Sequence, residues 1–307
     1  MSDTPDLGPL PRRIEVDADQ VRRLVAAQFP QWADLPVERV ADGGWDNWTF
    51  HLGSEMSVRL PSAFEYTEAV HKEHRWLPVF APRLPLPIST PLAKGEPGEG
   101  YPYSWSIYRW LEGETARADR IADPVRFALD LAAFLVALQG IEIADGPGPG
   151  QHNWYRGGTL RTYDGEANRG LTQLAGQVDV ELAAEIWKCA LDAPWGGVRR
   201  WFHGDIAQGN LLLREGQLAA VIDFGTCGVG DPSCDLAVAW TLLTGDGRRA
   251  FRRRLSVDDA TWARGRGWAL WKTLANYANA LDDGEAATAS SRTILDEIFA
   301  DYTDGDK

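Results

Sequence analysis

Cysteine is scarce in this sequence, and its scarcity argues against two kinds of scaffold. The 307 residues include three cysteines, Cys189, Cys227 and Cys234, and no C-x-x-C pair. An odd, widely spaced set fits neither a disulfide framework nor a zinc knuckle. We therefore expect a protein of a reducing compartment and predict a cytoplasmic location.

Long apolar runs are also missing. No stretch approaches the roughly 18 consecutive apolar residues that a transmembrane helix needs, so we expect no membrane span. The segment from Met1 to Arg13 is polar and proline-rich, without a basic region followed by an apolar run. We interpret it as a loose tail rather than a signal peptide.

Positive charge is in short supply. Lys and Arg total 31 against 44 Asp and Glu, for a net charge of −13, and no basic stripe with interleaved aromatics occurs. Nucleic acid is therefore not an expected partner. The acidity would steer a cationic ligand toward the protein, although solubility alone also explains it. The sequence carries no signal for an oligomeric state.

Histidine is sparse and tryptophan is abundant. His71 and His74 lie three residues apart on a predicted helix, but no third ligand is apparent, so we expect a polar face rather than a metal site. The 14 tryptophans exceed what a core of this size requires, and we expect several of them to line a ligand cleft.

The N-terminal third predicts an antiparallel sheet with one inserted helix. Apolar residues at helical spacing and the prolines that follow predict helices over 16–29, ended by Pro30, and 64–77, ended by Pro78. Segment 42–47, Asp-Gly-Gly-Trp-Asp-Asn, is typical of a tight turn, and 82–91 is proline-rich and extended. Expected strands cover 37–41, 48–52, 56–60 and 101–110.

After Gly113 the pattern becomes mainly helical. Asp231 and Pro232 indicate the start of a helix reaching about Thr244. Other expected elements are helices over 124–139 (buried), 179–191, 258–281 and 286–302, and short strands over 201–202, 211–213 and 219–222. We therefore predict an α+β chain of two lobes, residues 1–112 and 113–307.

The densest chemical signal lies between His203 and Gly225. Asp205 and Asn210 are five residues apart, and a predicted hairpin then leads to Asp223. Phosphoryl transfer needs a carboxylate that orients the attacking hydroxyl and hard oxygen ligands that hold Mg²⁺ against nucleotide phosphates. Asn210 and Asp223 supply such oxygens, which leaves Asp205 as the base. Its role is largely positional, so its pKa need not be raised.

Three motifs resemble those of the aminoglycoside phosphotransferases and, more broadly, the protein-kinase-like fold. They are H-G-D-x-x-x-x-N from His203, I-D-F-G from Ile222 and G-D-P-x-x-D-L-A from Gly230, and the resemblance spans about 37–281. It implies a bilobal kinase-like fold, with a nucleotide-binding lobe over 1–112 and a catalytic, acceptor-binding helical lobe over 113–307. It also implies that Asp205 is the catalytic base, Asn210 and Asp223 are magnesium ligands, and Asp235 braces the catalytic loop.

The same resemblance points to a nucleotide site in the first lobe. Gly43 and Gly44 would lay backbone N–H groups over the phosphates, or form an ordinary hairpin turn. Ser57 and Arg59 share one face of a strand, and Arg59 occupies the family's phosphate-pairing position, with Glu73 as its helical partner. The alternative is a surface Arg59–Glu73 pair.

Residues 107–113 resemble the family's hinge, which implies that the backbone near Arg109 and Leu111 binds the purine of ATP or GTP. Backbone recognition leaves the choice of nucleotide open.

The acceptor site is expected beside Asp205, walled by the helices after Gly113. An acidic pocket would suit a polyamine acceptor, and its candidates are Asp231, Asp164, Glu166, Asp282 and Asp283, each also explicable as a surface charge. The aromatic, glycine-rich segment 151–158 has no evident core role and would cover a sugar or a macrocycle.

The family implies a small-molecule hydroxyl as acceptor: an aminoglycoside first, a macrolide second, and a choline-, homoserine- or sugar-type metabolite as the alternative. A non-catalytic nucleotide-binding protein is disfavoured, because Asp205, Asn210 and Asp223 are all present. A hydrolase is disfavoured because no G-x-S-x-G motif occurs.

Overall fold

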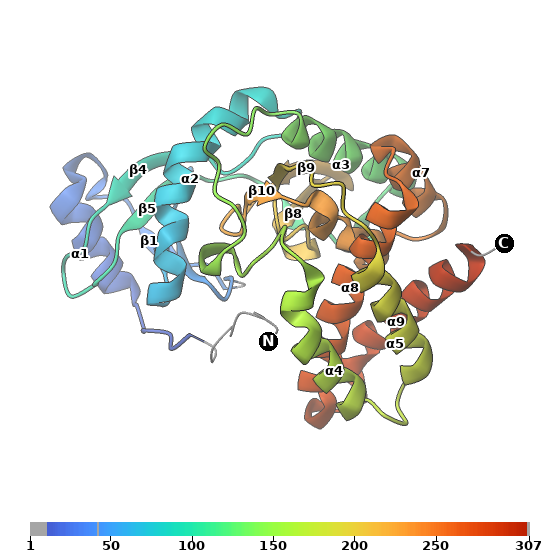
Figure 1. Ribbon diagram of the computed structural model, residues 1–307. Coiled ribbons are helices and arrows are strands. Elements are labelled where there is room, and N and C mark those ends of the chain that lie inside the picture. The colour runs from blue at the N-terminus through green and yellow to red at the C-terminus, as the bar shows by residue number, and fades with distance from the viewer. Residues whose placement is uncertain (1–10, 42, 306–307) are drawn as a thin grey trace.

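The computed structural model describes residues 11–41 and 43–305. The tail expected at the N-terminus lies outside the described residues up to residue 10, as does Asp42 of the expected turn. Figure 1 shows a sheet lobe (blue to cyan) beside a larger, mainly helical lobe (green to red). The predicted fold class is confirmed, while the division between 112 and 113 stays a prediction.

The sheet lobe holds five antiparallel strands in the order β1-β2-β3-β5-β4. Val58 and Leu60 of the central strand β3 enter a small core with Phe50 and Trp105, whereas Arg59 lies outside that cluster. The alternation of β3 is what aims Arg59 at the cleft. The elements are α1 (Ala18–Gln28), β1 (Val37–Arg39), β2 (Asn47–Leu52), β3 (Met56–Pro61), α2 (Thr67–Phe80), β4 (Pro91–Gly95) and β5 (Trp105–Arg109).

The expected limits of the inserted helix were wrong at both ends. A 3₁₀ turn over Phe64–Tyr66 precedes α2, which then continues through Pro78 to Phe80. Pro78 lies in the last turn, where its missing N–H removes a single intrahelical bond. Leu77 and Phe80 are fully buried, and their packing keeps that turn helical.

The helical lobe contains two small sheets that bring the motif residues together. A two-residue turn closes the hairpin of β8 and β9, and its residues, Glu215 and Gly216, both have positive φ. The Ile222 N–H donates to the Asn210 carbonyl at 2.9 Å, so the two ends of the hairpin meet. The strands are β6 (Glu114–Thr115), β7 (Arg200–Phe202), β8 (Leu211–Arg214), β9 (Gln217–Val221) and β10 (Gly228–Gly230).

The helices of this lobe are α3 (Pro124–Gln139), α4 (Asp164–Gln173), α5 (Val180–Asp192), α6 (Val238–Thr241), α7 (Gly245–Leu255), α8 (Asp259–Asn279) and α9 (Glu285–Gly305). The sequence did not predict α4 and α7. The helix expected from Asp231 to Thr244 is instead a 3₁₀ segment, Pro232–Ala237, followed by α6. Helix α3 has the expected bounds but is not buried all around, because Val125, Leu129 and Val136 are exposed.

The larger core reaches into the sheet lobe through α2. Trp76 and Phe80 of α2 pack edge-on against Trp201 of β7, with ring centroids 4.7 Å apart in both pairs. Phe80 also lies near Phe224, directly after the second motif aspartate. The helix that carries Glu73 is therefore seated on the core of the helical lobe.

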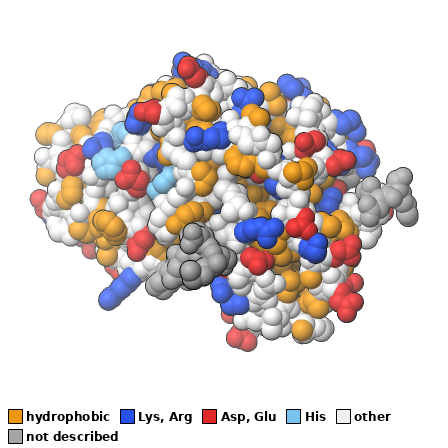
Figure 2. Space-filling model, viewed as in Figure 1, with side chains coloured by type: hydrophobic (Ala, Val, Ile, Leu, Met, Phe, Trp, Pro, Cys, Tyr) orange, Lys and Arg blue, Asp and Glu red, His pale blue; other side chains and the backbone are white. Residues whose placement is uncertain are grey.

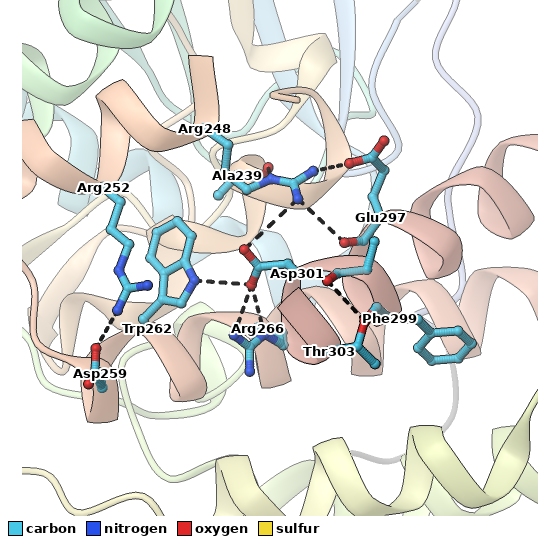
Figure 3. Close-up of polar contacts among 11 residues, drawn as sticks. Ala239, Arg248, Arg252, Asp259, Trp262, Arg266, Glu297, Phe299, Asp301 and Thr303 are labelled. Carbon is cyan, nitrogen blue, oxygen red and sulfur yellow. Dashed lines mark hydrogen bonds and ion pairs between the residues drawn. The ribbon is translucent and has the colours of Figure 1, made fainter. Parts of the chain in front are cut away.

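Helix α9 is fastened to α7 and α8 by a cluster of half-buried charges (Figure 3). Arg248 of α7 pairs with Glu297, and Arg266 of α8 donates to Asp301 Oδ2 at 2.8 Å. Trp262 donates its indole N–H to the same oxygen at 3.1 Å. The C-terminal half of α9 is thus held by directional contacts as well as by packing.

Charges of both signs are interspersed on the face shown in Figure 2. Within the described residues, no helix is long and apolar enough to cross a membrane.

Candidate active site

The loop of the first motif is braced from behind by Asp235. The two carboxylate oxygens of this buried residue accept the backbone N–H groups of His203, at 2.8 Å, and Gly204, at 2.7 Å. Gly204 has φ of +89°, and a Cβ there would lie 2.7 Å from the Thr226 carbonyl oxygen. Only glycine fits this close crossing, which joins the loop to the segment after Asp223.

His203 is a structural residue of the loop. Its Nε2 donates to the Ile222 carbonyl at 3.0 Å, and its Nδ1 accepts the Asp205 backbone N–H at 3.2 Å. This pattern requires the neutral Nε2–H tautomer. Burial lowers the pKa of His203, against the opposing effect of Asp205 and Asp223. The imidazole therefore holds the loop in place and is not placed to exchange protons.

Asp205 lies between Asn210 and a lysine that the sequence did not single out. Asn210 Nδ2 donates to Asp205 Oδ2 at 3.0 Å, and Lys272 Nζ of α8 contacts Asp205 Oδ1 at 2.6 Å. Burial opposes the charge on Asp205, but Lys272, Arg156 and His203 together outweigh it and lower the pKa of Asp205. The carboxylate is ionised at neutral pH, as a group that orients a hydroxyl by accepting its proton must be.

Asp223 is held in a conformation that few non-glycine residues adopt. Its φ is +65°, in the left-handed region that aspartate tolerates better than most side chains. Its Oδ1 pairs with Arg59 at 3.1 Å and accepts the Gly225 N–H at 3.4 Å. The strained backbone aims the carboxylate at the cleft, and such strain is typical of functional positions.

Arg59 joins Asp223 to the inserted helix. Its guanidinium also lies 3.7 Å from Glu73 Oε1, and its side chain is 14% exposed. Burial opposes its charge, but Asp223 and Glu73 outweigh that and raise the pKa of Arg59. This is a buried bridge, so the alternative of a surface pair does not apply.

Glu73 is buried and only partly satisfied. Tyr108 donates its hydroxyl to Oε2, and Oε1 has no hydrogen-bond partner among the described residues. Burial raises the pKa of Glu73, with Arg59 opposing that shift. The unmatched oxygen lies 3.7 Å from the Arg59 guanidinium, which is too far for a hydrogen bond but close enough for an ion pair.

The donor set around Asp223 fits a magnesium ion. Within the described residues, Asn210 Oδ1 and Asp223 Oδ2 receive no hydrogen bond. The backbone hydrogen bond from the Ile222 N–H to the Asn210 carbonyl holds their two segments together. A carboxylate and an amide oxygen are the hard ligands that Mg²⁺ takes beside nucleotide phosphates. Both residues predicted as ligands therefore have a side-chain oxygen that accepts no hydrogen bond within the described residues, and their role stays a prediction.

The glycine turn at Gly43 and Gly44 lies near Asp223 and Asp205, and Asp46 follows it. Gly43 and Gly44 are exposed, while Asp46 is half-buried. Burial, followed by the charges of Asp223 and Asp205, raises the pKa of Asp46 to about 7. The turn therefore faces the two motif aspartates, and the sequence reasoning had not assigned Asp46 any role.

The remaining nucleotide candidates divide into buried and open positions. Ser57 is buried within the sheet. The backbone N–H of Arg109 donates to the Thr90 carbonyl at 3.0 Å, so a purine contact at this residue would have to use its carbonyl, and its role stays a prediction. Leu111 makes no backbone hydrogen bond within the described chain, so it stays available for that role.

A cavity of about 260 Å³ adjoins Asp205 and is lined in part by α8 and α9. Arg156 and Lys272 bring positive charge to its lining, and Asp205 is the one acid among its described lining residues. Trp268, Trp271 and Lys272 lie three and four residues apart and share one face of α8. Helix α9 contributes Ser290, Ser291 and Ile294.

The acids expected around the acceptor lie outside this lining. Asp231 is buried, caps the 3₁₀ segment and pairs with Arg264 at 2.6 Å. Asp164 and Glu166 accept indole N–H groups from Trp187 and Trp271, at 2.7 and 2.8 Å. Asp282 and Asp283 are exposed on a 3₁₀ turn. None of the five acids is among the residues that line this cavity.

The segment 151–158 is packed rather than loose. Asn153 is fully buried, and a Cβ on Gly157, whose φ is +70°, would lie 2.0 Å from the Phe202 ring. The Asp231 N–H donates to the Gly157 carbonyl at 2.8 Å. The segment is a fixed wall beside the cavity, and Arg156 belongs to it.

Of the charged residues that line the cavity, the sequence reasoning named Asp205 and the segment of Arg156 but not Lys272. Lys272 is 67 residues from its partner Asp205, and no motif joins them. The one available signal was the W-x-x-W-K pattern on a predicted helix, which sets two indoles and an amine on one face.

Comparisons with known proteins fit this geometry. The family model described as "Phosphotransferase enzyme family" matches residues 37–268, which is more than half of the chain. No curated protein sequence matches the chain.

Solved structures of low sequence identity share the fold. The GDP complex of wild-type aminoglycoside 2'-phosphotransferase-IIIa has a TM-score of 0.70 at 17% identity, over 94% of this chain and 100% of that chain. A streptomycin–ATP complex of APH(2")-IIa gives 0.57 at 17%, over 93% and 99%. Macrolide 2'-phosphotransferase MphH from Brachybacterium faecium gives 0.58 at 20%, over 91% and 97%.

Proposed function

The chain belongs to the phosphotransferase enzyme family, and on that premise we propose that it transfers the γ-phosphoryl group of ATP or GTP, with Mg²⁺, to a small-molecule hydroxyl. The observation that carries the proposal is the convergence of Asp205, Asn210 and Asp223 at one edge of the β8–β9 hairpin, with Arg59 reaching Asp223 from the other lobe.

Each group has a distinct part in the proposed reaction. The acceptor oxygen bonds to the γ-phosphorus as the bond from that phosphorus to the β–γ bridging oxygen breaks, and the nucleoside diphosphate leaves. Asp205 orients the hydroxyl and takes its proton. Asn210 and Asp223 would hold Mg²⁺, which neutralises charge on the phosphates when bound. Arg59 would contact the phosphates from β3, and the glycine turn would cover them.

The lysine beside Asp205 bears on this reaction. Lys272 occupies one side of the Oδ1 atom toward which an acceptor hydroxyl would be directed. Its charge keeps Asp205 ionised and opposes the approach of a second cation at that point.

The antibiotic acceptors expected from the sequence rest on the fold alone. Neighbours of known structure act on or bind aminoglycosides and macrolides, as their descriptions state. The metabolic alternative is favoured by one observation, which is that the acceptor cavity combines modest volume with two basic side chains. Cytoplasmic location and a role in resistance stay predictions.

The test is Asp205→Ala in an assay that couples release of ADP or GDP to an optical signal, with and without Mg²⁺. We expect turnover to fall by about 1,000-fold, with nucleotide affinity changed by less than about threefold. Asp283→Ala, an exposed acid outside the cavity, is the control. Near-normal turnover in Asp205→Ala would remove this residue from the proposed chemistry.

A further inference from the structure

Arg156 is a cation that lines the acceptor cavity together with Asp205, which is near enough to feel its charge. Within the described residues it forms no ion pair, and its guanidinium donates to the Tyr163 hydroxyl at 2.6 Å. Its Cζ atom lies over three rings, those of Trp271, Tyr163 and Trp268, at 4.7, 5.3 and 5.4 Å from the centroids. The other arginines of this lobe that are as enclosed by protein, such as Arg248, Arg264 and Arg266, each have a carboxylate partner.

The surrounding structure holds Arg156 in position before any ligand binds. The glycine packing of segment 151–158 fixes its backbone, and the aromatic rings fix its side chain. A guanidinium offers five N–H donors, of which one is used by Tyr163. The remaining donors, next to a cavity, suit a planar anion that accepts two parallel hydrogen bonds.

The charges of the cavity favour the same kind of acceptor. Arg156 and Lys272 face a single acid, Asp205, and Lys272 is already paired with it. An acceptor with several ammonium groups would meet two cations and find no other carboxylate in the lining. The neutral polar lining residues, such as Ser290, Ser291 and Asn276, suit hydroxyl groups.

Cavity size is compatible with a small acceptor. Its volume of about 260 Å³ lies slightly below the roughly 300–1,000 Å³ typical of pockets for drug-sized ligands. A compound of about monosaccharide size fits such a volume.

Resting on the proposed phosphotransferase function, we propose that the acceptor is a small hydroxyl compound bearing a carboxylate, which Arg156 binds while the hydroxyl faces Asp205. Arg156 is then the residue that determines acceptor class. Lys272 acts with it by disfavouring an ammonium group next to the catalytic carboxylate.

The experiment compares matched probes that differ in one charged group. The first set is D-glucuronate, D-glucose and D-glucosamine, and the second is D-glycerate, glycerol and 3-amino-1,2-propanediol, with kanamycin as a polycation. Nucleoside diphosphate release is measured with Mg²⁺ and saturating ATP or GTP. At least one acid is expected to exceed its neutral and amino counterparts in kcat/KM by about tenfold or more.

Variants then assign the preference to Arg156. Arg156→Gln is expected to lower kcat/KM for the preferred acid by about 30-fold, with the KM for nucleotide unchanged. Arg156→Lys should restore part of the loss, because it restores the charge without the planar fork. Tyr163→Phe removes the hydrogen bond to Arg156 while the charge stays, so it separates the two effects. The matched control is Arg161→Gln, which changes an exposed arginine of the same region.

Several results would overturn the proposal. These are more efficient turnover of kanamycin or an amino probe than of either acid, no turnover of either acid, or an Arg156→Gln effect on the KM for nucleotide alone. In each case retained Mg²⁺-dependent nucleotide binding leaves the proposed phosphotransferase function standing. A wild-type protein that binds no nucleotide would instead overturn the proposed function itself.

Discussion

The proposed nucleotide side and acceptor side of the site differ in how their arginines are paired. On the nucleotide side Arg59 lies between the carboxylates of Asp223 and Glu73. On the acceptor side Arg156 rests on aromatic rings without an ion-pair partner in the described chain. The paired cluster needs no ligand to balance its charge, whereas Arg156 keeps N–H donors that a ligand anion could accept. On the proposed function, the first arrangement would serve a constant co-substrate and the second would serve selection.

The largest expected effect that tests this contrast comes from Asp223→Asn. Asparagine tolerates the positive φ at this position, so the fold is kept while one charge is removed. We expect Mg²⁺-dependent nucleotide affinity to fall by about 100-fold, with affinity in the absence of Mg²⁺ changed little. Calorimetry with ADP, with and without MgCl₂, measures both. An unchanged dependence on Mg²⁺ would exclude Asp223 as a ligand.

Arg59→Ala should produce the next largest effect and confine it to one side. The KM for nucleotide is expected to rise by about 30-fold, while that for the acceptor changes by less than about threefold. Since the variant leaves buried Glu73 unpaired, the double variant Arg59→Met/Glu73→Gln checks that instability is not the cause. Arg39→Ala, in the same sheet, is the control. Equal shifts in both KM values would break the contrast between the two sides.

The acceptor side can be disturbed from a distance through α9. Asp301→Asn removes the charge that Arg266 and Arg248 share, and we expect a loss of about 2 kcal/mol in the free energy of unfolding. Because the same helix supplies Ser290, Ser291 and Ile294 to the cavity, the KM for the best acceptor should rise about fivefold. The KM for nucleotide should not move, and Asp304→Asn, at an exposed position, is the control.

The smallest expected effect is a pH dependence of stability at the loop shared by both sides. Burial lowers the pKa of His203 in the folded state, so below pH 6.5 the unfolded chain takes up a proton that the folded chain does not. The stability contributed by this residue is therefore present above pH 6.5 and is lost as the pH falls. Urea unfolding of wild type and His203→Gln should give a stability gap that narrows between pH 7.5 and 5.5. A constant gap would contradict the neutral tautomer.

The nucleotide side was largely predictable from sequence because its parts are local. Asp205, Asn210 and Asp223 lie within one loop and hairpin, whose turn residues and spacing fix their approach. The brace by Asp235 also followed from a contiguous motif. The bridge from Arg59 to Glu73 was implied by the family resemblance, and strand alternation placed Arg59 on one face of β3.

The acceptor side was not predictable because its parts meet only through tertiary packing. Lys272 and Arg156 reach the cavity from α8 and from a distant loop, and the expected acids turned instead toward indole N–H groups or Arg264. Helix α7 was missed for a related reason. Its sequence is dominated by glycine and arginine, which do not suggest a buried helix. Arg248 is nevertheless buried, because its guanidinium donates to the Ala239 and Leu243 carbonyls.

The close packing of segment 151–158 on β7 and β10 has a thermodynamic consequence for the acceptor. A wall that is already ordered loses little conformational entropy when a ligand arrives, so acceptor binding should draw its selectivity from enthalpy. Binding heats for matched acceptors should then differ by their contacts with Arg156, while their entropies stay close. The glycines that bring this segment against Phe202 would thus determine how sharply the enzyme distinguishes one small alcohol from another.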